Sequence, residues 1–109
     1  MKLHNWIAGK AAAPASGEYL DNVDPKTGEV CGQIPRSNAE DADAAVTAAL
    51  AAPVLTVLER SELLFAVADA MTQRIPQLAE LESMDSGKTL AATTNGDIPR
   101  AIDNLRYYA

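Results

Sequence analysis

The sequence predicts an α/β fold in which short strands, at about residues 3–36, come before about four helices. The first third of the chain alternates apolar and polar residues and is interrupted by proline and glycine, a pattern typical of strands and turns. From Ser37 onward, apolar residues recur at the three- and four-residue spacing of helices. We expect these helices at about residues 38–52, 58–75, 76–86 and 97–109.

Three extended segments are expected in the first part, at residues 5–10, 18–23 and 29–35. A turn at 24–28 separates the last two, because Pro25 restricts φ and Gly28 accepts a positive φ. Residues 29–35 alternate in the manner of a half-buried strand. These two segments are therefore predicted to form a hairpin-like unit.

The first helix is expected to begin at a capping box formed by Ser37 and Glu40. Its polar residues are predicted to face solvent, Asp41 among them, together with Glu40, Asp43 and Thr47. Its predicted buried face consists of Ala42, Ala45, Val46, Ala49 and Leu50.

The later helices follow the same reasoning. Gly87 is predicted to end the third helix, and Thr93, Thr94 and Gly96 weaken helix in the connection that follows. Asp97 is the expected cap of the last helix. The predicted inward residues are Leu64, Val67, Ala68, Met71 and Ile75 in the second helix, Leu78 and Leu81 in the third, and Ile98, Ala101, Ile102, Leu105 and Tyr108 in the last.

Composition excludes several classes of function. The formal net charge of −6 and scattered basic residues argue against a nucleic-acid partner. The longest nearly apolar run, residues 48–58, is too short to span a membrane, so we expect no membrane association and a cytoplasmic location. Much of the 48% hydrophobic content is alanine, which buries little area. The chain is therefore a marginal small domain or part of something larger.

Few residues are candidates for chemistry. Gly87-Lys88-Thr89 resembles the end of a phosphate-binding loop, but Glu82 stands where that motif needs glycine and a helix precedes it. Cys31 is the only cysteine and His4 the only histidine, so a packed structural thiol is the expected role of Cys31. Asp97 could cap a helix or help to hold a hard cation, and the residues alone favour the cap.

The ordered set of motifs resembles the N-terminal part of the aldehyde dehydrogenase superfamily. The resemblance runs through residues 5–10, 24–30, the alanine-rich helix after Glu40-Asp41, Glu59-Arg60, 85–88 and 105–109. Residues 97–100, after 87–91, look most like the branch that oxidises 2-aminomuconic or 2-hydroxymuconic semialdehyde. The chain is then expected to be a partial N-terminal segment on the cofactor-domain side, without a complete second domain.

This resemblance implies an enzyme that oxidises an aldehyde or semialdehyde to a carboxylate with NAD or NADP. A cysteine thiolate, a glutamate and an asparagine carry out the chemistry in that family. None of them maps onto this chain, so no catalytic or cofactor-binding residue is expected here, and the isolated chain is predicted to be inactive. The resemblance also implies a structural monovalent cation at Asn22, Val23 and Asp97, and a homo-oligomer at full length.

A second hypothesis remains open at this point. The chain could be a non-catalytic interaction module, or a truncation remnant, that binds a partner through exposed helix faces. The reading frame beyond Ala109 distinguishes the two hypotheses. Continuation into a segment with a cysteine and a glutamate supports the first, and a stop codon supports the second.

Overall fold

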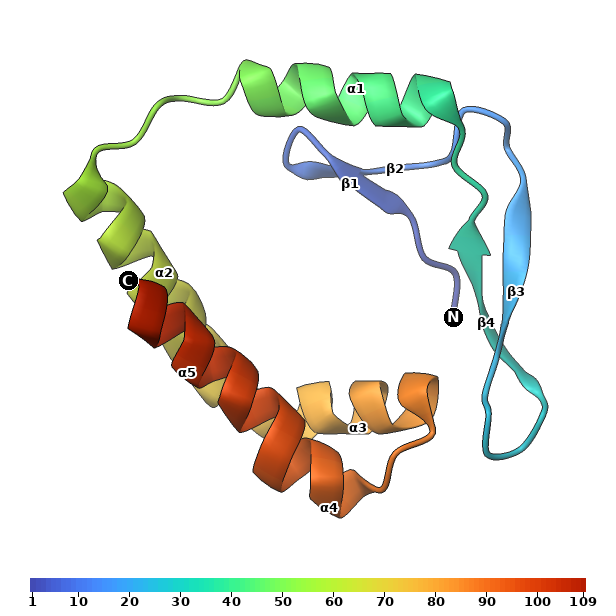
Figure 1. The fold of residues 1–109 in the computed structure, drawn as a ribbon. Helices are drawn as coiled ribbons and strands as arrows, with labels where there is room; N and C mark the ends of the chain where they lie inside the picture. Colours follow the sequence, from blue (N-terminus) through green and yellow to red (C-terminus); the bar gives the residue numbers. More distant parts are fainter. The chain divides into compact units, whose positions relative to one another are not determined.

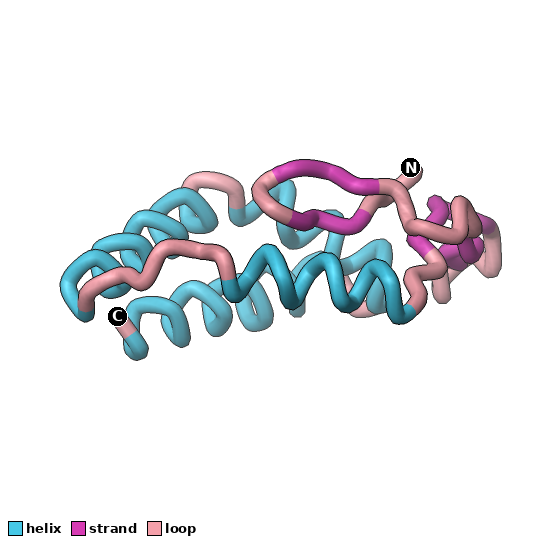
Figure 2. The backbone as a smooth tube through the Cα atoms, turned by 90° about the horizontal axis from the view of Figure 1, so that it is seen from above, coloured by secondary structure: helices cyan, strands magenta, loops and turns pink.

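The computed structural model describes all residues from 1 to 109 and divides them into two compact units. The first unit comprises residues 1–53 and contains all the strands, and the second comprises residues 54–109 and is helical (Figures 1 and 2). Each unit is described by itself. The α/β class and the order of strands before helices are confirmed. None of the helices combines the length and hydrophobicity needed to span a lipid bilayer.

The first unit holds two antiparallel hairpins rather than three strands. Strands β1 (Asn5–Ile7) and β2 (Lys10–Ala12) form the first hairpin, and β3 (Tyr19–Val23) and β4 (Val30–Pro35) form the second. Ala8 and Gly9 have φ values of 52° and 74°, which suit a two-residue hairpin turn. The prediction of one extended segment at residues 5–10 was therefore wrong, because the turn at Ala8 and Gly9 divides this segment between two strands.

Helix α1 (Ala39–Leu50) closes the first unit and packs against β1. Its cap is Asn38, whose side chain accepts hydrogen bonds from the backbone of Glu40 and Asp41, and the Asp41 side chain bonds back to Asn38. The capping box is real, but it lies one residue later than the predicted Ser37–Glu40 box. The predicted orientation was also wrong: Asp41 is buried, while Val46 and Leu50 are 58% and 83% exposed.

The second unit begins with α2 (Val57–Thr72) and α3 (Ile75–Ser86). Helix α2 ends three residues before the predicted boundary, at a turn in which Gln73 and Arg74 bond back to the last turn of the helix. Ala79 and Ser83 form the buried face of α3, so the prediction that Leu81 points inward was wrong, and Leu81 is 49% exposed.

The connection expected after residue 88 is largely helical. Helix α4 (Leu90–Ala92), the π-helical turn η1 (Thr93–Asp97) and α5 (Ile98–Tyr108) follow one another directly. Helix α5 lies along α2 (Figure 1), where Arg106 contacts Asp69 at 3.0 Å. The small core of this unit comprises Ala68, Ala79, Thr93 and Ile102. Tyr108 was predicted to point inward and is 78% exposed.

Candidate functional site

Asn22 and Val23, two of the three predicted cation ligands, lie at a bulge in the second hairpin. Asn22 pairs with Gly32 and Val23 with Val30, so Cys31 is the extra residue on β4. The Cys31 thiol donates a hydrogen bond to the backbone carbonyl of Asn22, with Sγ and O 3.3 Å apart. Bulges of this kind redirect backbone groups and are common near functional sites.

Asp97, the third predicted ligand, is not a helix cap. Its φ and ψ of −64° and −50° are helical, and its side chain makes no capping hydrogen bond. Helix already precedes it, because Ile98 N–H donates to the carbonyl of Thr93 in the π-helical turn. Backbone groups that a cap would satisfy are thus satisfied by the preceding turn, which is why the capping prediction was wrong.

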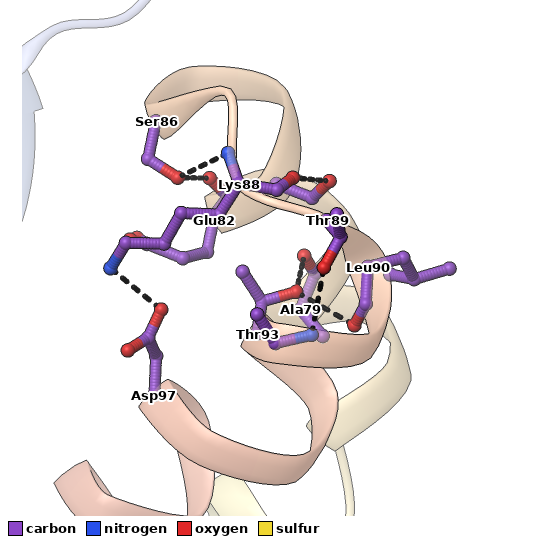
Figure 3. Close-up of polar contacts among 10 residues, drawn as sticks. Ala79, Glu82, Ser86, Lys88, Thr89, Leu90, Thr93 and Asp97 are labelled. Carbon is purple, nitrogen blue, oxygen red and sulfur yellow. Dashed lines mark hydrogen bonds and ion pairs between the residues drawn. The ribbon is translucent and has the colours of Figure 1, made fainter.

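The carboxylate of Asp97 is paired with Lys88. Lys88 Nζ lies 2.7 Å from Asp97 Oδ2 and 3.8 Å from Glu82 Oε1, as Figure 3 shows for the Asp97 contact. The hydrogen bond to Asp97 is the main reason that the pKa of Lys88 is raised above its ordinary value, although partial burial opposes it. Lys88 therefore stays protonated and holds a positive charge against this carboxylate.

The backbone around Lys88 is fixed by the end of α3. Gly87 has a φ of 76°, the left-handed conformation of a helix-ending glycine, and this confirms it as the predicted helix stop. Ser83, only 5% exposed, donates its hydroxyl to the Lys88 carbonyl at 2.7 Å. The segment is thus a structured helix end that points Lys88 at Asp97 (Figure 3), and its lysine has an intramolecular anionic partner.

Thr93 anchors the π-helical turn. It is fully buried, and its hydroxyl donates to the Ala79 carbonyl at 2.9 Å, which ties η1 to α3 (Figure 3). Thr89 supports the same region by accepting a hydrogen bond from Ala92 N–H at 3.2 Å. Sequence reasoning missed both threonines as structural residues. For Thr89 a signal was available, because threonine is a favoured N-cap residue and the helix that follows supplies the Ala92 amide three positions later.

The predicted ligands therefore supply carbonyl oxygens in the first unit and a carboxylate in the second. Oxygen donors of these types suit a hard cation, so the residue chemistry fits the expected ion. The Lys88 ammonium already lies 2.7 Å from the Asp97 carboxylate. A cation that binds there must therefore share the carboxylate with the lysine or displace it.

The other candidate groups have ordinary partners. The Cys31 thiol bonds to a carbonyl rather than to a base, and His4 Nδ1 lies 2.9 Å from the Tyr19 hydroxyl. Lys2 lies over the Tyr19 ring, with Nζ 3.8 Å from its centroid. No group of three or more histidine, cysteine, aspartate or glutamate side chains is arranged to hold a metal ion.

Comparisons with known proteins agree on one family. The family model described as "Aldehyde dehydrogenase family" matches residues 12–109. The chain is 41% identical to an acetaldehyde dehydrogenase of Pseudomonas aeruginosa over 96% of its own length and 22% of the relative's. It is 42% identical to the 2-aminomuconic semialdehyde dehydrogenase of Bos taurus over 100% of its own length and 23% of the relative's.

Solved structures give the same result. An NAD-dependent aldehyde dehydrogenase from Sinorhizobium meliloti superimposes with a TM-score of 0.88 at 36% identity, covering 98% of this chain and 22% of that one. An NAD⁺ complex of aldehyde dehydrogenase from Bacillus cereus gives 0.92 at 28% identity, covering 99% and 23%. The chain thus spans somewhat over a fifth of the length of these relatives. With a family model matched over residues 12–109, this chain belongs to the aldehyde dehydrogenase family.

Proposed function

We propose that this chain is the scaffold portion of a dehydrogenase that oxidises an aldehyde or semialdehyde to a carboxylate with NAD or NADP. The observation that carries the proposal is the match over nearly the whole chain to a structure described as an NAD⁺ complex, with a TM-score of 0.92. The likeness to a 2-aminomuconic semialdehyde dehydrogenase supports a semialdehyde as one candidate substrate.

The catalytic groups are proposed to lie outside these 109 residues. In support, Cys31 donates its thiol hydrogen to the Asn22 carbonyl instead of facing a general base, which a thiolate nucleophile needs. The chain would then contribute structure on the cofactor-domain side, without a complete second domain. A homo-oligomeric state and a cytoplasmic location belong to the same proposal.

An interaction module remains the alternative function. It draws support from large apolar side chains at the surface, such as Leu50 and Tyr107, each 83% exposed. A segment of a larger dehydrogenase fold has the same property, because its apolar faces pack against the rest of that fold. The match to whole enzymes along 96% to 100% of this chain favours the dehydrogenase.

The test is aldehyde oxidation by the whole protein. We expect NADH or NADPH to form only when an aldehyde is present, and acetaldehyde and a muconic semialdehyde are the first substrates to compare. Running each substrate with both nucleotides assigns the cofactor preference. Absence of aldehyde-dependent turnover with every combination would contradict the proposed activity.

We further propose that Asn22, Val23 and Asp97 help to hold a structural monovalent cation in the whole protein. The support is chemical, because the three positions offer carbonyl and carboxylate oxygens. Asp97→Asn removes the negative charge and keeps the size of the side chain. We expect this variant to lose the extra thermal stability that potassium or sodium chloride gives over choline chloride. An equal salt response in parent and variant would count against the site.

A further inference from the structure

We propose that the Lys88 ammonium is a built-in counter-ion of Asp97 that competes with a free monovalent cation for this carboxylate. The inference rests on the proposed cation role of Asp97 and concerns how binding at that residue is regulated. It starts from the 2.7 Å contact between Lys88 Nζ and Asp97 Oδ2 (Figure 3).

The backbone of Lys88 is held in place by hydrogen bonds. The Lys88 carbonyl accepts the Ser83 hydroxyl at 2.7 Å, and its N–H donates to Ser86 Oγ at 3.3 Å. Both serines belong to α3, and the left-handed Gly87 turns the chain just before Lys88. Only the side chain of Lys88 is therefore free to move between Asp97 and solvent.

The aspartate side is fixed to the same helix. Asp97 ends the π-helical turn that Thr93 ties to the Ala79 carbonyl of α3 at 2.9 Å. Because both backbones are anchored to α3, the pair closes a short loop and needs no large rearrangement to form. Lys88 is thus a cation held beside Asp97 by the fold itself.

The pair is accessible enough to be exchanged. The side chains of Lys88 and Asp97 are 50% and 34% exposed, so water and small ions reach both. A lysine ammonium is a compact, well-hydrated point charge on a flexible stem, and in charge it resembles a potassium or sodium ion. Glu82, 3.8 Å from Nζ, offers the ammonium a second carboxylate when it leaves Asp97. Displacement of Lys88 is therefore a local side-chain movement.

The test compares parent protein, Lys88→Met, Asp97→Asn and the double variant by thermal unfolding of the whole protein. Potassium chloride is titrated against choline chloride at equal ionic strength, and the potassium-specific stabilisation gives an apparent dissociation constant. Lys10→Met, at an exposed position of β2, is the matched control for the loss of one positive charge.

We expect Lys88→Met to lower the apparent potassium dissociation constant about two- to fivefold, the range that a half-exposed ion pair can contribute. Lys10→Met should match the parent, and the double variant should show no potassium-specific response. If Lys88→Met and the parent respond equally while Asp97→Asn abolishes the response, the competition is disproved and the cation site stands. If neither the parent protein nor Lys88→Met is stabilised specifically by potassium, both proposals are disproved.

Discussion

The carboxylate of Asp41 joins three parts of the first unit. It accepts hydrogen bonds from Ala15 N–H at 2.9 Å, from Asn38 N–H at 3.0 Å and from the Asn5 side chain at 3.4 Å. Its exposed fraction is 7%. One side chain therefore completes the capping box of α1 and also holds the loop between the two hairpins.

Replacing Asp41 with alanine should destabilise the protein by about 1–2 kcal/mol, because the backbone N–H groups of Ala15 and Asn38 lose the buried carboxylate that accepts their hydrogen bonds. Asp43→Ala, on an exposed position of the same helix, is the matched control and should change stability by less than about 0.5 kcal/mol. Urea unfolding of both variants measures the difference. Equal losses in the two variants would show that Asp41 is an ordinary surface residue.

The role of Asp41 could be predicted only in part from the sequence. A serine or asparagine followed three positions later by a carboxylate is a recognisable capping signal, but Ser37–Glu40 and Asn38–Asp41 both offer it. The structure resolves this choice because Ser37 donates its hydroxyl to Asn5 instead, at 2.9 Å. That contact spans the unit, and no local pattern contains it.

At the scale of elements, two glycines near the cation-binding candidate have opposite conformational needs. Gly87 has a φ of 76°, where a side chain is strained. Gly96 lies inside the π-helical turn without a positive φ, and a Cβ added there would meet no atom within 4 Å. Glycine is therefore required at position 87, whereas at position 96 it only lowers the stability of the helical turn.

Gly87→Ala should lower the free energy of unfolding by about 1 kcal/mol, because alanine resists the left-handed conformation. Gly96→Ala should raise it by about 0.4–1 kcal/mol, because alanine loses less backbone entropy in a helix. Denaturant midpoints of the two variants, measured side by side, check both signs. Two changes of the same sign would contradict the backbone assignments of this region.

The start of α2 carries a pH-dependent contribution to stability. Glu59 accepts hydrogen bonds from the Thr56 backbone and hydroxyl, both at 2.7 Å, and the backbone bond is the larger cause that lowers the pKa of Glu59. A lowered pKa in the folded state means that the contribution is complete above the pKa of an unfolded glutamate, about 4.3. It is lost as the pH falls through the folded value.

Glu59→Ala should therefore be less stable than the parent at pH near 7, and this difference should shrink as the pH is lowered below about 4. Glu62→Ala, at an exposed position of the same helix, controls for the loss of one carboxylate. Unfolding midpoints across the acid range give the comparison. A difference that stays constant or grows on acidification would be evidence against the capping box at Thr56.

Helix positions were predictable from spacing, but the connection after Gly87 was not. Thr93, Thr94 and Gly96 have low helix propensity, and the sequence therefore indicated an interruption. In the structure the buried Thr93 hydroxyl bonds to Ala79, a residue 14 positions earlier, and the segment is helical. Tertiary contacts of this kind outweigh propensity differences of a few tenths of a kcal/mol per residue.

At the scale of the whole molecule, many more large apolar side chains are exposed than are buried. Ala68, Ala79 and Ile102 are the buried hydrophobic residues, while Leu50 and Tyr108 stay 83% and 78% exposed. Helical spacing identified these apolar stripes but carried no information about what packs on them. Inward orientations were therefore wrong for five large apolar residues that remain exposed: Val46, Leu50, Val67, Leu81 and Tyr108.

We propose that this chain contributes structure to an aldehyde dehydrogenase whose reacting groups lie outside these 109 residues. The most direct measurement is NADH formation by the purified 109-residue chain and by the whole protein, assayed together with NAD⁺ and a muconic semialdehyde or acetaldehyde. We expect aldehyde-dependent turnover by the whole protein and none by the 109-residue chain. Clear turnover by the short chain alone would contradict it.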